Sequence, residues 1–179
     1  TMSWVQATTT LGGDIGLNFY VKLSDSLVAD ETTFMRFVFN GKTIDVPLKD
    51  AKKSESGGEI QYRFTCFINA KNMADTVTAQ VMTSQGPVGR STSLAVMTYC
   101  NYMIANSKDA ELVSLMKAML NYGAAAQILL NHNTDNLANA TLTAEQIALP
   151  ESYRSDMVST VASPAQAKQG VFYNNKGFS

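Results

Sequence analysis

Apolar and polar residues alternate through most of the first half of the chain. Between residues 15 and 23 every odd position is apolar, and mostly polar side chains stand between them. A period of two residues predicts a β-strand with one face in the core. The same argument predicts strands over residues 60–69 and 76–83, with further short strands over 4–10 and 88–91.

A tight hairpin is predicted between residues 34 and 48. Asn40-Gly41 suits a type I′ turn, which needs positive φ at both central positions. This turn alone fixes the register, and the register places three apolar or mixed pairs on one face and one ion pair on the other. The predicted pairs are Phe39 with Lys42, Phe37 with Ile44, Met35 with Val46, and Arg36 with Asp45.

Residues 49–58 are polar and end in Gly57-Gly58, so we expect a loop there. The remaining segments give about seven short antiparallel strands. Their number and spacing predict an antiparallel β-sandwich of the Ig-like kind.

The apolar period changes to that of a helix from residue 94 onward. We expect one helix over 94–106, capped by Ser91 or Ser93, and a second that begins after Ser107 or Asp109 and runs to about residue 131. The short turn between them predicts an antiparallel helical hairpin. The apolar face predicted for the second helix consists of Leu112, Leu115, Met116, Met119, Gly123, Ala126 and Leu130.

The fold class predicted from these elements is α+β, mainly β, with the helical hairpin packed on the sandwich. The sandwich should occupy residues 1–93 and the hairpin 94–131, within the same domain. Residues 132–179 should form a polar loop, a short helix that begins with the capping box Thr143 to Gln146, and a C-terminal extension. Gly170 to Tyr173 reads as a strand that could start a further β unit.

Charge narrows the possible partners. Only 16% of the residues are charged, the net charge is −1, and the charges are scattered along the chain. No single-sign face forms for a phosphate backbone or an anionic membrane, so neither nucleic acid nor membrane insertion is expected. A surface of hydroxyl and amide groups is common in extracellular modules.

The sequence offers no recognisable catalytic constellation. His132, the one histidine, lies at the polar end of the second helix, where a cation is favoured electrostatically. The fifteen scattered acids identify no catalytic pair, so a glycan hydrolase is the least favoured alternative. The Asn-rich residues 131–139 lack the Gly and the terminal Glu of a calcium loop. We expect a non-enzyme with no metal and no cofactor.

Two cysteines leave an alternative open. Cys66 falls on the inward face of its strand, and Cys100 falls on the buried face of the first helix. They are either two small core residues or one disulfide that joins helix to sheet.

Exposed aromatic rings are the best candidate binding groups, because sugar rings commonly stack on them. A carbohydrate-binding site would use Trp4, Tyr20, Phe67 and Tyr173. The alternative is that the helices cover these rings, which would then belong to the core.

The second helix contains Leu-Asn-Tyr-Gly-Ala-Ala-Ala-Gln at residues 120–127. Gly in a helix interior costs about 1 kcal/mol relative to Ala, so a close contact should compensate for it. We expect a structural seam, where this helix closely approaches its partner helix or the sheet and the amide of Gln127 binds nearby backbone. The seam residues are Tyr122, Gly123, Ala126 and Gln127.

Three stretches of sequence resemble a known kind of module. They are IGLNFYV at residues 15–21, INAKNMAD at 68–75, and AMLNYGAAAQ at 118–127, which is followed by NTDNLA at 133–138. Together they are similar, over residues 10–150, to a module of large secreted or wall-associated multidomain proteins of gut-type Firmicutes. The resemblance implies a secreted or cell-surface location beside Ig-like, leucine-rich-repeat or carbohydrate-active domains, and it supplies no catalytic residue.

The function expected from these observations is a non-catalytic accessory module of a larger bacterial surface protein, acting as a spacer, adhesion or protein-interaction unit. Its partners would be other domains of the same polypeptide, and also glycans or surface proteins. A carbohydrate-binding module is the alternative.

Overall fold

The computed structural model describes residues 1–11 and 13–142. These residues divide into two compact units. The sandwich unit comprises Thr1–Thr8, Leu17–Cys66 and Thr76–Leu94. The helical unit comprises Thr9–Gly16, Phe67–Asp75 and the described residues from Ala95 to Leu142.

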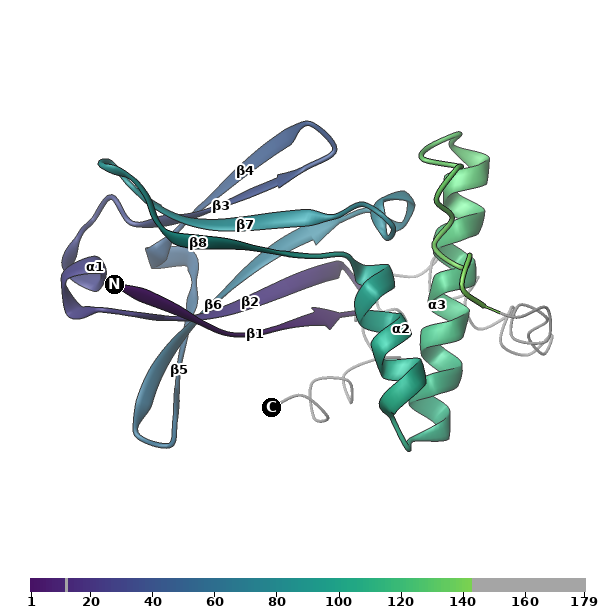
Figure 1. Cartoon of the computed structure of the whole chain (residues 1–179), viewed down its shortest axis with the longest axis horizontal. Coiled ribbons are helices and arrows are strands. Elements are labelled where there is room, and N and C mark those ends of the chain that lie inside the picture. Colours follow the sequence, from purple (N-terminus) through teal and green to yellow (C-terminus); the bar gives the residue numbers. More distant parts are fainter. Residues whose placement is uncertain (12, 143–179) are drawn as a thin grey trace. The chain divides into compact units, whose positions relative to one another are not determined.

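The described strands form two four-stranded antiparallel sheets, which confirms the predicted two-sheet architecture (Figure 1). The described part of the chain contains eight strands, where about seven were expected. The first sheet has the order β1 (Met2–Thr10), β2 (Ile15–Leu23), β6 (Glu59–Ile68), β5 (Lys52–Ser56). The second has the order β4 (Lys42–Pro47), β3 (Phe34–Phe39), β7 (Val77–Thr83), β8 (Gly86–Leu94).

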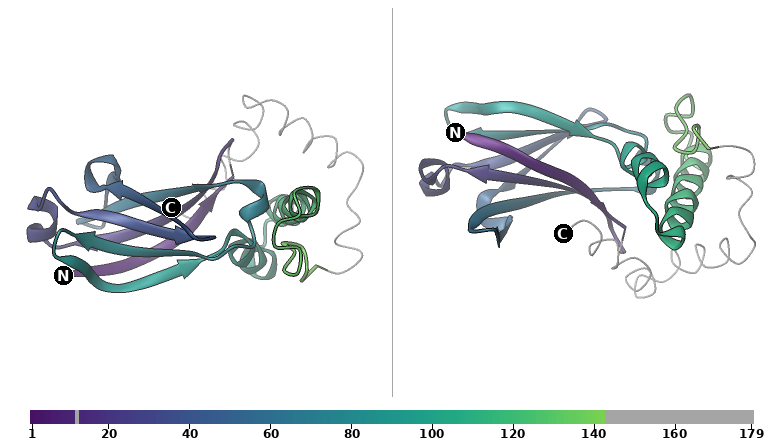
Figure 2. Two further views of the ribbon diagram at one scale, coloured as in Figure 1. Left: turned by 90° about the horizontal axis from the view of Figure 1, so that it is seen from above. Right: turned by 60° about the horizontal axis from the view of Figure 1, so that its bottom comes forward.

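The core of the sandwich unit lies between the two sheets, which Figure 2 shows from two further sides. Phe19 of β2 and Phe37 of β3 are fully buried, and their ring centroids are 5.5 Å apart. Each such ring removes enough apolar surface from water to stabilise the fold by about 2–3 kcal/mol. Most of the inward positions predicted from the alternation are buried: Leu17, Phe19, Val21, Met35, Phe37, Tyr62, Phe64, Cys66, Val77, Ala79 and Val81. Ile15 and Leu23, at the two ends of β2, are only half-buried, and Ile60, where β6 pairs with the exposed strand β5, has 44% of its surface exposed.

The β3–β4 hairpin has the register that the turn predicts. Asn40 and Gly41 adopt φ values of 50° and 70°, as a type I′ turn requires. Arg36 binds Asp45 through two parallel hydrogen bonds, Nε to Oδ1 and Nη2 to Oδ2, each 2.9 Å long. All four predicted pairs are confirmed: Phe39 with Lys42, Phe37 with Ile44, Met35 with Val46, and Arg36 with Asp45.

The loop predicted for residues 49–58 is wrong. The segment contains a 3-10 turn, η1 (Leu48–Asp50), and then strand β5, which pairs with β6 through the Gly57-Gly58 turn. All five β5 residues are exposed, so the strand has no buried face to create an alternating pattern. The short helix α1 (Asp25–Ala29) was also not predicted.

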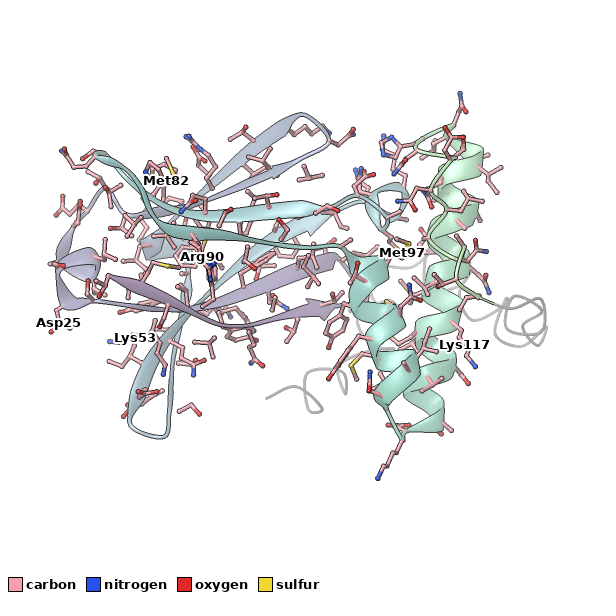
Figure 3. The ribbon with its side chains drawn as sticks, in the orientation of Figure 1. Asp25, Lys53, Met82, Arg90, Met97 and Lys117 are labelled. Carbon is pink, nitrogen blue, oxygen red and sulfur yellow. The ribbon has the colours of Figure 1, made fainter. Side chains whose placement is uncertain are left out.

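Strands β1 and β8, at the edges of the two sheets, are joined by a side chain. The indole Nε1 of Trp4 in β1 donates a hydrogen bond of 2.8 Å to the carbonyl of Arg90 in β8; Arg90 is labelled in Figure 3. The Trp4 ring also meets the Phe19 ring edge-on, with 6.3 Å between centroids. Trp4 therefore helps to close one side of the sandwich.

The helical unit contains the 3-10 turn η2 (Ala70–Asn72) and two helices in contact, α2 (Val96–Asn106) and α3 (Ala110–Leu129). The cap predicted for α3 is confirmed, because Asp109 accepts hydrogen bonds from the backbone N–H of Glu111 and Leu112. The cap predicted for α2 is wrong. Its N-cap is Ala95, which has no side-chain acceptor. The packing of this helix pair on the sandwich stays a prediction, as do the predicted domain bounds.

The buried face of α3 differs from the predicted one. Leu115, Met119 and Ala126 are only half-buried, and Leu130 lies beyond the helix with 58% of its surface exposed. Because α3 contacts both α2 and η2, it buries two adjoining stripes and not a single narrow one. The buried residues of α3 are Leu112, Met116, Ala118, Leu120, Gly123, Ala124 and Gln127.

Candidate functional site

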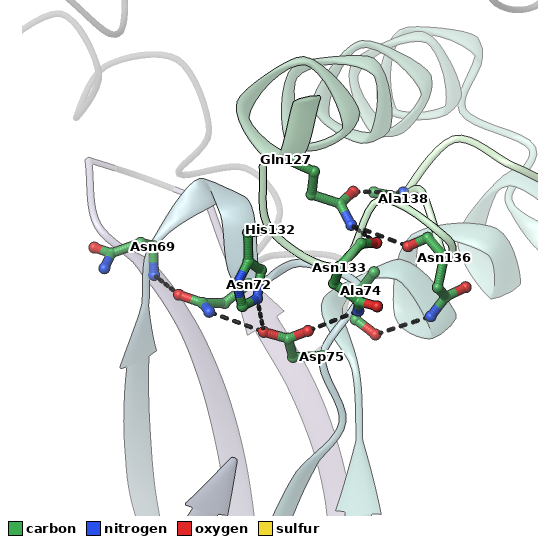
Figure 4. A network of polar contacts seen from close by, with 9 residues as sticks. All are labelled: Asn69, Asn72, Ala74, Asp75, Gln127, His132, Asn133, Asn136 and Ala138. Atoms are coloured by element: carbon green, nitrogen blue, oxygen red, sulfur yellow. Dashed lines mark hydrogen bonds and ion pairs between the residues drawn. The ribbon is translucent and has the colours of Figure 1, made fainter. Parts of the chain in front are cut away.

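The densest polar cluster described in the helical unit surrounds Asp75, which follows η2. Its carboxylate accepts hydrogen bonds from Nδ2 of Asn72 at 2.8 Å, Nδ2 of Asn133 at 2.9 Å and Nε2 of His132 at 2.8 Å (Figure 4). Two of these donors lie 57 and 58 residues away in the sequence. A single carboxylate thus joins the segment before β7 to the segment after α3.

The environment of Asp75 keeps its carboxyl ionised at neutral pH. Burial alone would raise its pKa, but the hydrogen bonds from Asn72, His132 and Asn133 outweigh burial and lower the pKa. An ionised carboxylate only accepts hydrogen bonds, so Nε2 of His132 must carry a proton. That nitrogen is a donor to Asp75 and cannot act there as a general base.

Local backbone features hold both sides of this contact in place. On one side, Asn69 and Asn72 form a capping box around η2. On the other side, Asn131 and Asn133 adopt positive φ values of 48° and 51°, which turn the chain sharply after α3. Asn is one of the few residues that tolerate this conformation.

Gln127 makes a second group of contacts near the end of α3. Its side chain has no exposed surface. Nε2 donates to the carbonyls of Asn133 at 3.1 Å and Asn136 at 3.0 Å, while Oε1 accepts from the N–H of Ala138 at 2.8 Å. Both amide hydrogens and the amide oxygen are thus used on backbone groups of the following loop. The expected hydrogen bonds between the Gln127 amide and nearby backbone are therefore present, and the side chain that makes them is fully buried.

We refer to these linked contacts as the Asp75–Gln127 network. Its members come from the η2 segment, the end of α3 and the loop that follows α3 (Figure 4). The members are Asn69, Asn72, Ala74, Asp75, Gln127, His132, Asn133, Asn136 and Ala138.

The seam residues of α3 lie beside this network. A Cβ added at Gly123 would stand 2.6 Å from Sδ of Met73 and 3.2 Å from Cβ of Ala138, so only glycine fits without a shift. Tyr122 and Ala126 are half-buried, and burial raises the pKa of Tyr122. Gly123 thus brings α3 close to the η2 segment and to the loop at once.

The Asn-rich loop uses its amide groups as hydrogen-bond donors. The side-chain nitrogens of Asn133 and Asn136 point to acceptors of the network, and Nδ2 of Asn139 donates to Oδ1 of Asn121 at 2.9 Å. A calcium ion would need oxygens turned toward a common centre. Within residues 1–11 and 13–142, no group of three or more His, Cys, Asp or Glu side chains is placed to hold a metal ion.

The four candidate sugar-stacking rings lie in different settings. Trp4 packs against Phe19 and its N–H is engaged, as described above, while Tyr20 is half-buried in β2. Phe67, at the end of β6, belongs to the helical unit and has 60% of its surface exposed. Tyr173 lies outside the described residues.

The two cysteines are free thiols. Both are buried, and burial raises the pKa of each to about 12. A thiol with such a pKa is almost entirely protonated at neutral pH, so neither cysteine is an activated nucleophile.

A run of exposed apolar side chains ends α3. Ile128, Leu129 and Leu130 expose 61%, 83% and 58% of their surfaces. Three consecutive residues are spaced about 100° apart around a helix, so they cannot all face one side of it. A run of three apolar residues was therefore a signal in the sequence that some of them are exposed, although the prediction placed Leu130 on the buried face. Such a run is unusual on a surface and is typical of a contact with another apolar group.

Comparison with known proteins supplies no further guide, since no family model, no curated protein and no solved structure matches this chain. In the part of the chain described, none of the helices has both the length and the apolar character to cross a membrane. The interpretation of the site therefore depends on the chain's own residues.

Proposed function

We propose that this chain is a non-catalytic extracellular accessory module of a larger bacterial surface protein, in which it acts as a spacer and protein-interaction unit. The observation that carries the proposal is the use of the Asp75–Gln127 network. Its polar groups form hydrogen bonds with one another and with the backbone of the helical unit. They hold three segments together, and this is a structural task.

The same network supports the proposed membership in a multidomain surface protein. The motif segments at residues 68–75, 118–127 and 133–138, on which the resemblance depends, each contribute members to the network. A family that shares these residues would then share a way of fixing its fold, and would need no common substrate. Asp75, Gln127 and Asn133 are the residues that we expect such modules to have in common.

The interaction part of the proposal depends on Ile128, Leu129 and Leu130. Their exposed aliphatic side chains suit an apolar surface on another domain of the same polypeptide. The amide-rich loop beside them can add hydrogen bonds at the rim of such a contact.

Localisation of the native protein tests the proposal directly. Antibodies raised against the chain should label intact cells that produce the full-length protein, with a cytoplasmic protein as the control for cell integrity. Labelling that appears only after lysis would contradict an extracellular module.

A carbohydrate-binding module remains the second candidate because Phe67 is exposed. A bound sugar ring typically stacks on the exposed face of such an aromatic side chain. A glycan array should then give signals that Phe67→Ala abolishes. Tyr102→Ala is the matched control, because Tyr102 is an aromatic of the same unit with 62% of its surface exposed. Silence of the unaltered chain on the array would remove this candidate.

A further inference from the structure

Among the strands that the structure describes, β5 is a free edge of the sandwich unit. It stands last in its sheet, next to β6, and all five of its residues are exposed. Figure 1 shows the β5–β6 hairpin extending away from the other strands, and Figure 3 labels Lys53 on it. An open edge presents backbone N–H and C=O groups to which another strand can bind.

The hairpin geometry determines which β5 residues offer those groups. Ser56 and Glu59 flank the two-residue Gly57-Gly58 turn, and residues in this position normally form a hydrogen-bonded pair. Hydrogen-bonded and non-bonded pairs alternate along an antiparallel ladder. By this alternation the backbone groups of Lys53 and Glu55 are directed to the free edge.

The sequence of β5, Lys-Lys-Ser-Glu-Ser, is complementary to itself in one register. If two copies pair antiparallel about Ser54, all five residues overlap and Lys53 of each copy stands opposite Glu55 of the other. Registers centred on Lys53 or on Glu55 place like charges opposite each other and shorten the overlap. A two-fold interface requires this kind of self-complementarity.

We propose that β5 pairs antiparallel with β5 of a second copy, so that two four-stranded sheets join into one sheet of eight strands. Lys53 and Glu55, whose backbone groups face the edge, form hydrogen-bonded pairs across the two-fold axis. Their side chains form two ion pairs on one face of the joined sheet.

Charge on an edge strand usually discourages pairing, and here it also selects the partner. Lysine is common on edges because a foreign strand seldom offers an acid at the right position. A second copy of β5 does offer such an acid, because Glu55 stands opposite Lys53 on each side of the two-fold axis. The same Lys53 that repels other strands therefore favours this one.

The size of the contact sets its strength. Five residues per copy and two exposed ion pairs form a small interface, for which a weak and concentration-dependent dimer is expected. Ile60 of β6 stands beside Glu55 in the ladder with 44% of its surface exposed, and the aliphatic part of Lys53 from the second copy can pack on it.

Sedimentation equilibrium of the full chain over a wide concentration range, at low ionic strength, tests the proposal. Lys53→Glu should weaken the dimer by about tenfold or more, because two attractive pairs become two repulsive ones. Adding Glu55→Lys to this variant should restore it. Lys52→Glu is the matched control: it makes the same change in net charge, but residue 52 faces Ser56 of the second copy.

Cross-linking tests the register independently of affinity. Ser54 stands opposite itself at the two-fold axis, so Ser54→Cys should give a disulfide-linked dimer on mild oxidation. Ser56→Cys, which faces Lys52, should not, and the native Cys66 and Cys100 are buried. A chain that stays monomeric at all concentrations, or a dimer unaffected by Lys53→Glu, would overturn the proposal, as would equal cross-linking of the two cysteine variants.

Discussion

The sandwich unit and the helical unit are stabilised in different ways. In the sandwich unit the decisive contacts are apolar, such as the one between Phe19 and Phe37, and the bidentate pair Arg36–Asp45 lies at the surface. In the helical unit a buried amide and a largely buried carboxylate, Gln127 and Asp75, join segments that are distant in sequence.

This difference decides what a polar substitution should cost in each unit. When a surface ion pair is broken, water replaces the lost partner, so the free energy of unfolding changes little. A buried polar group that loses its partner cannot reach water, so the loss is much larger. The same chemical type of contact is therefore nearly dispensable in one unit and essential in the other.

The largest effect should come from the apolar core of the sandwich unit. Phe37→Ala should lower the free energy of unfolding by about 3–5 kcal/mol, because a fully buried ring is replaced by a cavity. Denaturant unfolding measures this loss. Val38→Ala, one residue later on the exposed face, should change stability by no more than about 0.5 kcal/mol.

A polar substitution in the helical unit should lower the free energy of unfolding by nearly as much. Gln127→Leu keeps the volume but removes the partners of the Ala138 N–H and of the Asn133 and Asn136 carbonyls. The loss should be on the order of 2–4 kcal/mol. Hydrogen exchange should rise in residues 131–142 and stay unchanged in β3. Lys117→Leu on the same helix is the control, and an equal effect there would argue against the network.

Overpacking of the seam should cost somewhat less. Gly123→Leu must displace Met73 and Ala138, at a cost of about 1–3 kcal/mol. Ala125→Leu, an exposed position on the same helix, adds the same kind of bulk without a clash. The two melting temperatures should therefore differ, and an unchanged melting temperature for Gly123→Leu would exclude the close contact.

Acid should weaken the helical unit through Asp75. Its folded pKa lies below the ordinary value of 3.8, so its contribution to stability is complete above about pH 4 and is lost as the pH falls through the folded pKa. Asp75→Asn should be less stable at pH 7, and its difference from the unaltered chain should shrink below pH 4. Unfolding free energies measured between about pH 2.5 and about pH 7 test this. A constant difference would exclude the linkage.

The smallest effect should come from the exposed ion pair of the β3–β4 hairpin. Arg36→Ala should cost about 0–1 kcal/mol, because both side chains are substantially exposed. A double-mutant cycle with Asp45→Ala isolates the pair. A coupling energy as large as the effect of Gln127→Leu would remove the contrast between the two units.

Features of the fold that depend on residues close together in the sequence were the easiest to predict. Asn40-Gly41 fixes a register within a few residues of itself, and Asp109 caps a helix that begins at the next residue. These are local effects, and the sequence was sufficient to predict them. Strand β5 was missed because it buries nothing, and a strand without a buried face leaves no periodic signal.

The candidate site was harder to predict because its contacts are distant in sequence. The Gly and Ala residues of α3 indicated a close approach, but nothing in the pattern identified Met73 and Ala138 as the neighbours. Asp75 and His132 lie 57 residues apart, and neither stands out among the other polar residues. Only the fold brings them together.

The placement of the two cysteines has a practical consequence for the comparison of the units. Cys66 belongs to the sandwich unit and Cys100 to the helical unit, and both thiols are shielded in the folded chain. A thiol-specific reagent can modify each one only when its unit opens. The mass added over time, with Cys100→Ala to assign the signals, therefore reports the opening of each unit separately. The chain carries one native chemical probe for each of its two units.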